Sequence, residues 1–247
     1  MVETIYVPVF WGGETLLDEK ALKYFRENKI KSVALFRSIQ FSFKEIKEQL
    51  EKLGIKVNIT KAKRTSEKGQ ILGCDAYHDS FFETIIEDSD AILYIGDGMF
   101  HPKALLLSQS NSKNFKEVII WDPISKSLEI LDKKAIKAQI IRRKRNLRLF
   151  LNASKIGILV TLKPGQQHLS IALNLKQKLE KEGKKAYIFL DNTFDFSHFE
   201  NYPFIDAWVN SACPRIGTDD IVNLNQTLIN IKEAFDPIKE LDSLDIF

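Results

Sequence analysis

The residues of this chain best suited to metal binding or catalysis are its two cysteines, Cys74 and Cys213. Each lies in a short, loop-like stretch, residues 73–75 and 212–214. Thiolates bind soft metal centres such as zinc or an iron–sulfur cluster, but two thiolates fall short of the three or four ligands that such a centre usually needs. The alternative is a pair of buried structural thiols, because free cysteine is among the most buried residue types.

Two further loops, each following an apolar run, offer backbone N–H groups to a cofactor. They contain Gly96, Asp97 and Gly98 in the first loop and Lys163, Pro164, Gly165 and Gln166 in the second. N–H groups at the start of a helix, together with a lysine, bind carboxylates and other anions. His101 titrates near neutral pH and is the candidate for proton transfer. The alternative is a pair of ordinary strand-to-helix turns, the first with Pro102 opening its helix.

Strands and helices that alternate along the chain must position these groups. Strands are expected at residues 5–10, 32–39, 55–59, 90–95, 118–121 and 127–131, and then from 155, at 186–190 and at 206–211. Helices are expected at residues 15–28, after a capping box at 42–45, at 78–88, at 132–152, before Gly183, and once in the tail from 224. This order predicts an α/β fold with mainly parallel sheets covered on both faces, and ligands at the carboxyl ends of the strands.

The two halves of the chain also resemble one another. Each has a strand, a helix whose apolar residues lie eight and four positions before a closing glycine, a second strand and then a cysteine. The matching positions are Ile46, Leu50 and Gly54 in the first half and Leu175, Leu179 and Gly183 in the second. We therefore predict two similar three-layer α/β lobes, residues 1–153 and 154–247, related as internal repeats with each cysteine at the same topological position.

Composition narrows the class of protein. A content of 44% hydrophobic and 28% charged residues is ordinary for a globular protein, and a net charge of +3 is too small to argue for a nucleic-acid partner. The basic cluster at residues 142–145 is expected to form a solvated helix face. Two distant cysteines suit a reducing compartment, and neither a signal peptide nor an apolar run of about 18 residues is evident, so we expect a soluble, cytoplasmic protein. The sequence carries no Walker, dinucleotide-binding, zincin or nucleophile-elbow motif.

Four motifs, in order, resemble those of the diphthamide synthase family. They are GQILGCD at residues 69–75, YIGDGMFHP at 94–102, TLKPGQ at 161–166 and DAWVNSACPRI at 206–216. The resemblance covers most of residues 5–222. It implies three similar α/β lobes in a triangle, each giving one cysteine to a [4Fe-4S] cluster whose open iron binds S-adenosylmethionine. The activity it implies is transfer of a 3-amino-3-carboxypropyl radical to a histidine of translation elongation factor 2.

Within this resemblance, Cys74 is similar to the second-lobe cluster ligand and Cys213 to the third-lobe ligand. The two loops and His101 would face the cofactor, and whether His101 or His168 handles a proton stays open. The first lobe has no counterpart here, and Met99 stands where the family often has arginine. We expect that lobe to come from another polypeptide. A non-catalytic partner subunit, or a two-lobed module that binds a small metabolite without a cluster, remains an alternative.

Overall fold

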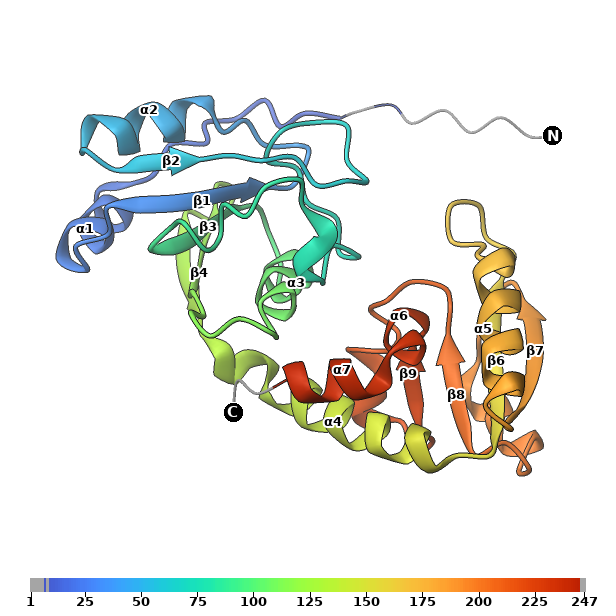
Figure 1. Ribbon diagram of the computed structural model, residues 1–247. Coiled ribbons are helices and arrows are strands. Elements are labelled where there is room, and N and C mark those ends of the chain that lie inside the picture. The colour runs from blue at the N-terminus through green and yellow to red at the C-terminus, as the bar shows by residue number, and fades with distance from the viewer. Residues whose placement is uncertain (1–6, 8, 245–247) are drawn as a thin grey trace. The chain divides into compact units, whose positions relative to one another are not determined.

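The computed structural model describes Val7 and residues 9–244, and the chain divides into two units, Met1–Ala135 and Ile136–Phe247 (Figure 1). Each unit is built on one mainly parallel sheet with helices packed on it, which confirms the predicted α/β class. The strand expected at residues 5–10 lies partly outside the described residues, and its described part is not a strand. In the described part of the chain, no helix combines the length and the apolar composition needed to cross a bilayer.

The first unit contains a five-stranded sheet in the order β2-β1-β3-β4-β5. Its strands are β1 (Ser32–Arg37), β2 (Lys56–Asn58), β3 (Ala91–Ile95), β4 (Val118–Asp122) and β5 (Ser127–Leu131). The first four are parallel, and β5 is the predicted edge strand, antiparallel to β4. The helices are α1 (Glu19–Glu27), α2 (Lys44–Lys52) and α3 (Phe100–Ser108). Helices α1 and α2 cover one face, where Phe25 and Leu50 join the core with Leu35 and Trp121, and α3 lies on the other (Figure 1).

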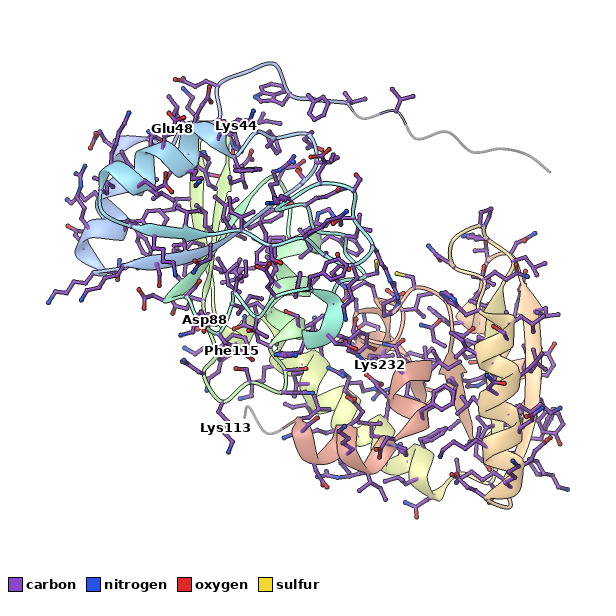
Figure 2. All side chains as sticks on the ribbon, turned by 45° about the horizontal axis from the view of Figure 1, so that its top comes forward. Lys44, Glu48, Asp88, Lys113, Phe115 and Lys232 are labelled. Carbon is purple, nitrogen blue, oxygen red and sulfur yellow. The ribbon has the colours of Figure 1, made fainter. Side chains whose placement is uncertain are left out.

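Helix α2 begins without the predicted capping box. Its first residue follows Phe43, and Glu45, the expected capping carboxylate, instead accepts a hydrogen bond from the Thr15 hydroxyl (3.0 Å). The other predicted features of this helix are present: Leu50 is buried, and Gly54 ends the helix with a φ of 77°. Lys44 lies on the solvent face of the helix (Figure 2). A long-range partner has therefore displaced a local cap that the sequence pattern favoured.

The helix expected at residues 78–88 is wrong. Only a 3-10 turn, His78–Ser80, forms there, and the remainder is irregular. Phe81 pairs as an isolated antiparallel bridge with Ala62, and Lys63 donates its N–H to the Ser80 carbonyl (2.9 Å). Backbone groups of residues 80–82 pair with residues 61–63, so they do not make helical hydrogen bonds, and residues 85–88 form only turns.

The second unit contains a four-stranded parallel sheet in the order β7-β6-β8-β9. Its strands are β6 (Lys155–Thr161), β7 (Lys185–Asp191), β8 (Ala207–Asn210) and β9 (Leu228–Asn230), and its helices are α4 (Lys137–Asn152), α5 (Leu169–Lys181), α6 (Ile231–Phe235) and α7 (Pro237–Ser243). Strand β9 and the division of the tail into two helices correct the single tail helix that was predicted. A strand of three residues gives almost no periodic signal, and it forms here because β8 pairs with it.

Helix α4 belongs to the second unit, because the chain divides between Ala135 and Ile136, whereas the boundary was predicted after residue 153. The helix packs against β8, β9 and α7 and buries Ile140, Leu147 and Phe150. Arg143, in the basic cluster predicted to be solvated, is 1% exposed and ion-paired with Glu233 (2.7 Å). The prediction of a fully solvated face is therefore wrong at Arg143.

In each unit, the aspartate directly before the third strand accepts hydrogen bonds from backbone N–H groups at the N-terminal end of the first strand. Asp90 Oδ2 accepts hydrogen bonds from the backbone N–H groups of Lys31 (2.8 Å) and Ser32 (2.9 Å). Asp206 Oδ2 accepts bonds from residues 154–155 in the same way (2.9 and 2.8 Å). The order β2-β1-β3-β4 also matches β7-β6-β8-β9. These correspondences support the predicted internal repeat.

Replacing Asp90 by asparagine is expected to lower the free energy of unfolding by about 1 kcal/mol at pH 7, less than is usual for hydrogen bonds to charged groups because the site is exposed. The hydrogen bond from the Lys31 N–H is the main cause that lowers the pKa of Asp90. This stability is present above the unfolded pKa of about 4 and is lost as the pH falls through the lower folded pKa.

Urea denaturation of both proteins at several pH values measures this difference, which should shrink as the pH falls through the lowered folded pKa of Asp90, because the wild-type carboxylate then loses its charge. Asp88→Asn is the control, because Asp88 is exposed (Figure 2) and should behave as wild type. An Asp90→Asn difference that is the same at every pH would contradict the assignment.

Candidate functional site

Cys74 lies in a closed turn of the first unit. The Asp75 N–H donates to the Leu72 carbonyl (3.0 Å), and Asp75 Oδ2 accepts the Leu72 N–H (2.8 Å). The Asp75 side chain is buried, and this burial raises the pKa of its carboxyl group, which the bond from Leu72 opposes. The two bonds fix the backbone on both sides of Cys74, whose side chain is half-buried and not part of a disulfide.

The turn lies at the carboxyl end of the first sheet. Arg37, the last residue of β1, accepts the Ile71 N–H (3.2 Å) and donates its own N–H to the Gly69 carbonyl (2.7 Å). The buried Arg37 guanidinium donates to the carbonyls of Ile39 (2.8 Å) and Phe41 (3.0 Å). Parallel α/β sheets bind ligands at this edge, so Cys74 lies where the fold favours a site.

The loop between β3 and α3 contains the other predicted groups of the first unit. Gly96 and Gly98 have φ values of 154° and 66°, which side chains other than glycine rarely adopt. A Cβ on Gly96 would also lie 2.6 Å from the Tyr94 hydroxyl. Helix α3 begins at Phe100, so Pro102 is its third residue and not the first, as was expected.

Tyr94 and His101 form a polar pair beside this loop. The Tyr94 hydroxyl lies 3.2 Å from His101 Nδ1, and the two rings are stacked with centroids 6.0 Å apart. Burial raises the pKa of Tyr94, so the phenol keeps its proton at neutral pH and can donate it. A neutral His101 that accepts this bond at Nδ1 carries its own proton on Nε2. A His101 that instead carries its proton on Nδ1 donates it to the Tyr94 oxygen, so either tautomer keeps the contact at Nδ1.

The Cys74 turn and the His101 loop meet within the first unit. A Cβ placed on Gly73 would lie 1.9 Å from Cε1 of Phe100, the residue before His101. Only a residue without a side chain allows this approach of the two segments. The segments that carry Cys74 and His101, which the sequence predicted separately, are thus in contact through Gly73 and Phe100.

Cys213 follows β8 in the second unit and is also half-buried and not disulfide-bonded. Its carbonyl accepts the Asn210 side-chain amide (2.8 Å) and the Ile216 N–H (3.1 Å). Ala91 and Ala207 occupy the same register against β1 and β6, so Cys213 corresponds in position to Asp97.

The expectation that both cysteines occupy the same topological position is therefore wrong. Cys74 precedes the third strand of its unit, and Cys213 follows the third strand of the other. The error arises because the segment between β2 and β3 returns to the end of β1 through the Arg37–Gln70 bridge before β3 begins. Both thiols nevertheless lie at the carboxyl ends of parallel strands.

The Lys163–Gln166 loop is an exposed, ordered turn between β6 and α5. The Gln166 N–H donates to the Lys163 carbonyl (3.1 Å), and Gly165 has a φ of 76°. The Lys163 N–H donates to the Thr161 hydroxyl (3.2 Å), which in turn donates to the Asn192 carbonyl. The helix begins at Leu169, after His168. The loop is exposed to solvent, but the N–H groups of Lys163 and Gln166 already donate within the chain and Pro164 has no N–H, so the predicted anion site depends mainly on the Lys163 side chain.

Sequence reasoning missed three polar residues that support these loops, Tyr94, Asn210 and Asn230. The sequence feature that could have revealed them is a polar residue near the end of an otherwise apolar strand. Asn210 and Asn230 are the last residues of β8 and β9. Such a residue is buried only where it has hydrogen-bond partners.

The described residues do not provide enough ligands for a metal centre by themselves. Across the described ranges, no three His, Cys, Asp or Glu side chains gather in a way that could hold a metal ion. Each unit contributes one thiol. An iron–sulfur cluster requires further ligands.

Comparison with known proteins identifies the family. The sequence profile of the diphthamide synthesis proteins matches residues 1–242. The chain belongs to this family. The 2-(3-amino-3-carboxypropyl)histidine synthase of Pyrococcus horikoshii is 31% identical over 192 residues, which cover 77% of this chain and 52% of that protein. Subunit 1 of the corresponding synthase of Yarrowia lipolytica is 30% identical over 154 residues, or 62% of this chain and 32% of that protein.

Solved structures of the diphthamide synthesis family agree with this result. Dph2 from Pyrococcus horikoshii, in a crystal structure with a 4Fe-4S cluster, has a TM-score of 0.68 to this chain at 28% identity. The match covers 92% of this chain and 62% of that one. The chain therefore spans about half the length of its Pyrococcus synthase relative and less than two thirds of the solved Dph2 chain.

Proposed function

We propose that this chain is a component of the enzyme for the first step of diphthamide biosynthesis. The reaction is transfer of a 3-amino-3-carboxypropyl group from S-adenosylmethionine to a histidine of translation elongation factor 2, in the cytoplasm. The observation that carries the proposal is the family match across both thiol motifs, each of which forms an ordered turn at the carboxyl end of a parallel sheet. Another chain, a separate first-lobe polypeptide or a family paralogue, supplies the first lobe.

In this proposal Cys74 and Cys213 are two of the ligands of a [4Fe-4S] cluster, and the partner chain provides the third. Three cysteines leave one iron open, and the cluster then supplies reductive chemistry toward S-adenosylmethionine. The chemistry of the donors fits this role, because both are half-buried thiols in turns held by backbone bonds. The number of donors in this chain alone does not, which is why the proposal requires a partner.

The remaining residues act on the substrates. Gly96, Asp97 and Gly98 border the cofactor in the first unit, and the Lys163–Gln166 turn binds the carboxylate of S-adenosylmethionine through the Lys163 ammonium group, because the Lys163 and Gln166 N–H groups already donate within the chain. His101 holds or moves the proton of the target imidazole at Nε2, since Tyr94 occupies Nδ1. These roles are proposals that follow from residue chemistry and from the family.

Anaerobic purification followed by reconstitution with iron and sulfide tests the proposal. We expect broad visible absorption and bound iron when the chain is co-expressed with its first-lobe partner, which a pull-down from native extract should identify as a protein with one essential cysteine. Cys74→Ala and Cys213→Ala should each abolish cluster binding, because only two thiols remain. Lys163→Ala should weaken S-adenosylmethionine binding without loss of iron, and Lys176→Ala, on the nearby helix, is its control.

Two outcomes would overturn the proposal. If either cysteine variant keeps its iron and its absorption, that thiol is structural. If the colourless protein binds S-adenosylmethionine equally well with and without the partner, the chain is a metabolite-binding module.

A further inference from the structure

Two buried amide side chains hold the backbone on both sides of Cys213. The Asn210 Nδ2 group donates to the Cys213 carbonyl (2.8 Å), and Asn210 Oδ1 accepts the Ala212 N–H (3.0 Å). The Asn230 Nδ2 group donates to the Pro214 carbonyl (2.8 Å). Three consecutive residues, 212–214, are thus each tied through the main chain to one of two side chains.

The two amides are also bonded to each other. Asn210 Nδ2 donates to Asn230 Oδ1 (2.7 Å), so both of its hydrogens are used. Asn210 is 1% exposed and Asn230 is 2% exposed. Water has little access to replace these bonds, and hydrogen bonds in such surroundings are electrostatically stronger than in water.

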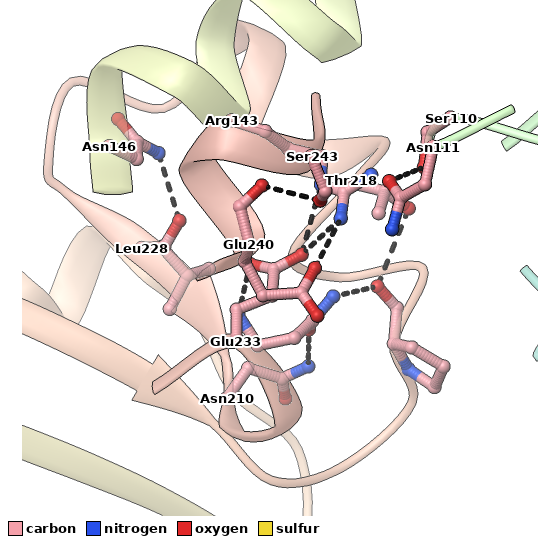
Figure 3. A network of polar contacts seen from close by, with 12 residues as sticks. Ser110, Asn111, Arg143, Asn146, Asn210, Thr218, Leu228, Glu233, Glu240 and Ser243 are labelled. Atoms are coloured by element: carbon pink, nitrogen blue, oxygen red, sulfur yellow. Dashed lines mark hydrogen bonds and ion pairs between the residues drawn. The ribbon is translucent and has the colours of Figure 1, made fainter. Parts of the chain in front are cut away.

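The pair is anchored to the helices of the second unit. The Asn230 N–H donates to Glu233 Oε2 (3.1 Å), and Arg143 Nε donates to Glu233 Oε1 (2.9 Å), which is also ion-paired with Arg143 Nη2 (2.7 Å). Figure 3 shows Arg143, Glu233 and Asn210 in this network, with Glu240 of α7 beside Arg143. All four side chains of this network are buried: Arg143, Glu233, Asn230 and Asn210. A continuous set of buried polar contacts therefore connects α4 with the Cys213 loop.

The loop that follows Cys213 also packs tightly against the Asn230 side chain. A Cβ on Gly217 would lie 2.2 Å from Asn230 Oδ1. Glycine is therefore required at residue 217 if the amide is to keep its place.

We propose that Asn230, acting with Asn210, is the positioning residue for the Cys213 thiol. An amide can do this because it donates and accepts at once: aspartate at 230 would accept from Asn210 but could not donate to Pro214, and leucine could do neither. The assignment deepens the proposed function, since a cluster ligand must be held in fixed geometry, but the arrangement of the loop does not depend on a bound cluster.

Alkylation of the full chain with iodoacetamide under native conditions, followed by peptide mass spectrometry, tests the assignment. Cys74, in the other unit, is the internal reference. In Asn230→Ala the labelling rate of Cys213 relative to Cys74 should rise about five- to tenfold. The reason is that losing about one net hydrogen bond raises the population of the open loop, in which the thiol reacts, by about this factor. Gly217→Ala, which displaces the amide without removing it, should act in the same direction and serves if Asn230→Ala does not fold.

Asn146→Ala is the matched control. Asn146 is also fully buried, but its amide donates to the Leu228 carbonyl (2.8 Å) on β9 and not to residues 212–214. It should lower stability and leave the labelling ratio unchanged, which separates positioning from a general loss of packing.

The outcomes distinguish this inference from the proposed function. Equal ratios in Asn230→Ala, Gly217→Ala and Asn146→Ala would overturn the positioning role, whatever the protein binds. A raised ratio confined to the first two variants supports it, even if iron reconstitution of the wild type fails and the proposed function falls. If the wild type does take up iron, Asn230→Ala should also alter the electron paramagnetic resonance spectrum of the reduced cluster.

Discussion

Replacing Arg143 by alanine is expected to lower the free energy of unfolding by about 3–5 kcal/mol, the cost of leaving one partner of a buried ion pair without the other. Arg143 is 1% exposed, and Glu233, which accepts the Arg143 Nε–H and is ion-paired with Nη2, is 0% exposed. Without the guanidinium, the carboxylate must stay charged in a site that excludes water or take up a proton. Urea denaturation followed by the fluorescence of Trp208, which lies in the same unit, measures the change.

Arg145→Ala is the control for this prediction. Arg145 belongs to the same basic cluster on α4 but is exposed, so its loss should change the free energy of unfolding by less than about 0.5 kcal/mol. Replacing both members of the pair, as Arg143→Met with Glu233→Leu, should recover part of the loss, because no buried charge is left alone. A cost below about 1 kcal/mol for Arg143→Ala would mean that the pair is hydrated in solution.

Replacing Trp208 by alanine should cost about 3–5 kcal/mol, the range for a large aromatic side chain removed from a core. Trp208 is 2% exposed and stacks on Phe199, with ring centroids 4.2 Å apart and an interplanar angle of 15°. Phe189 packs edge-on against it at 4.8 Å. A Cβ on Gly157 would lie 2.4 Å from Trp208 Cε3, so the neighbouring strand has no side chain that could fill the cavity.

Phe204→Ala tests whether burial causes this effect. Phe204 belongs to the same aromatic cluster, through Tyr187 and Tyr202, but it is 42% exposed, and its removal should cost about 1 kcal/mol or less. Urea denaturation of the two variants gives the comparison. Equal costs would show that Trp208 is not the centre of the core in the second unit.

Much of the fold could be predicted because its signals are local. Apolar runs such as residues 90–95 became strands, and the glycines at 54 and 183 follow the helix ends where the spacing of buried leucines placed them. A positive φ after a helix is a property that glycine carries by itself. Such features depend on no distant partner, so the sequence alone is enough to predict them.

The errors share a different cause, which is a partner far away in the sequence. Glu45 was read as a helix cap, but Thr15 holds its carboxylate. Arg143 was read as part of a solvated face, but Glu233, on a helix near the end of the chain, buries it. Local patterns cannot reveal these contacts, because each requires the tertiary structure to exist first.

In the candidate site, too, residues with a local signal could be predicted and residues whose role depends on a distant partner could not. Cys74, Cys213 and His101 could be named from their chemistry and motifs. Tyr94 and Asn230 could not, since a tyrosine in a strand or an asparagine before a helix has many ordinary roles, and only the distances to His101 and Pro214 give them a specific one.

The beginning and the end of the second unit are neighbours in space. Helix α4 opens the unit, α7 closes it, and the two pack together, with Arg143 between Glu233 and Glu240. A unit whose termini lie side by side can be appended, excised or permuted as one block, because joining or cutting the chain there disturbs little else.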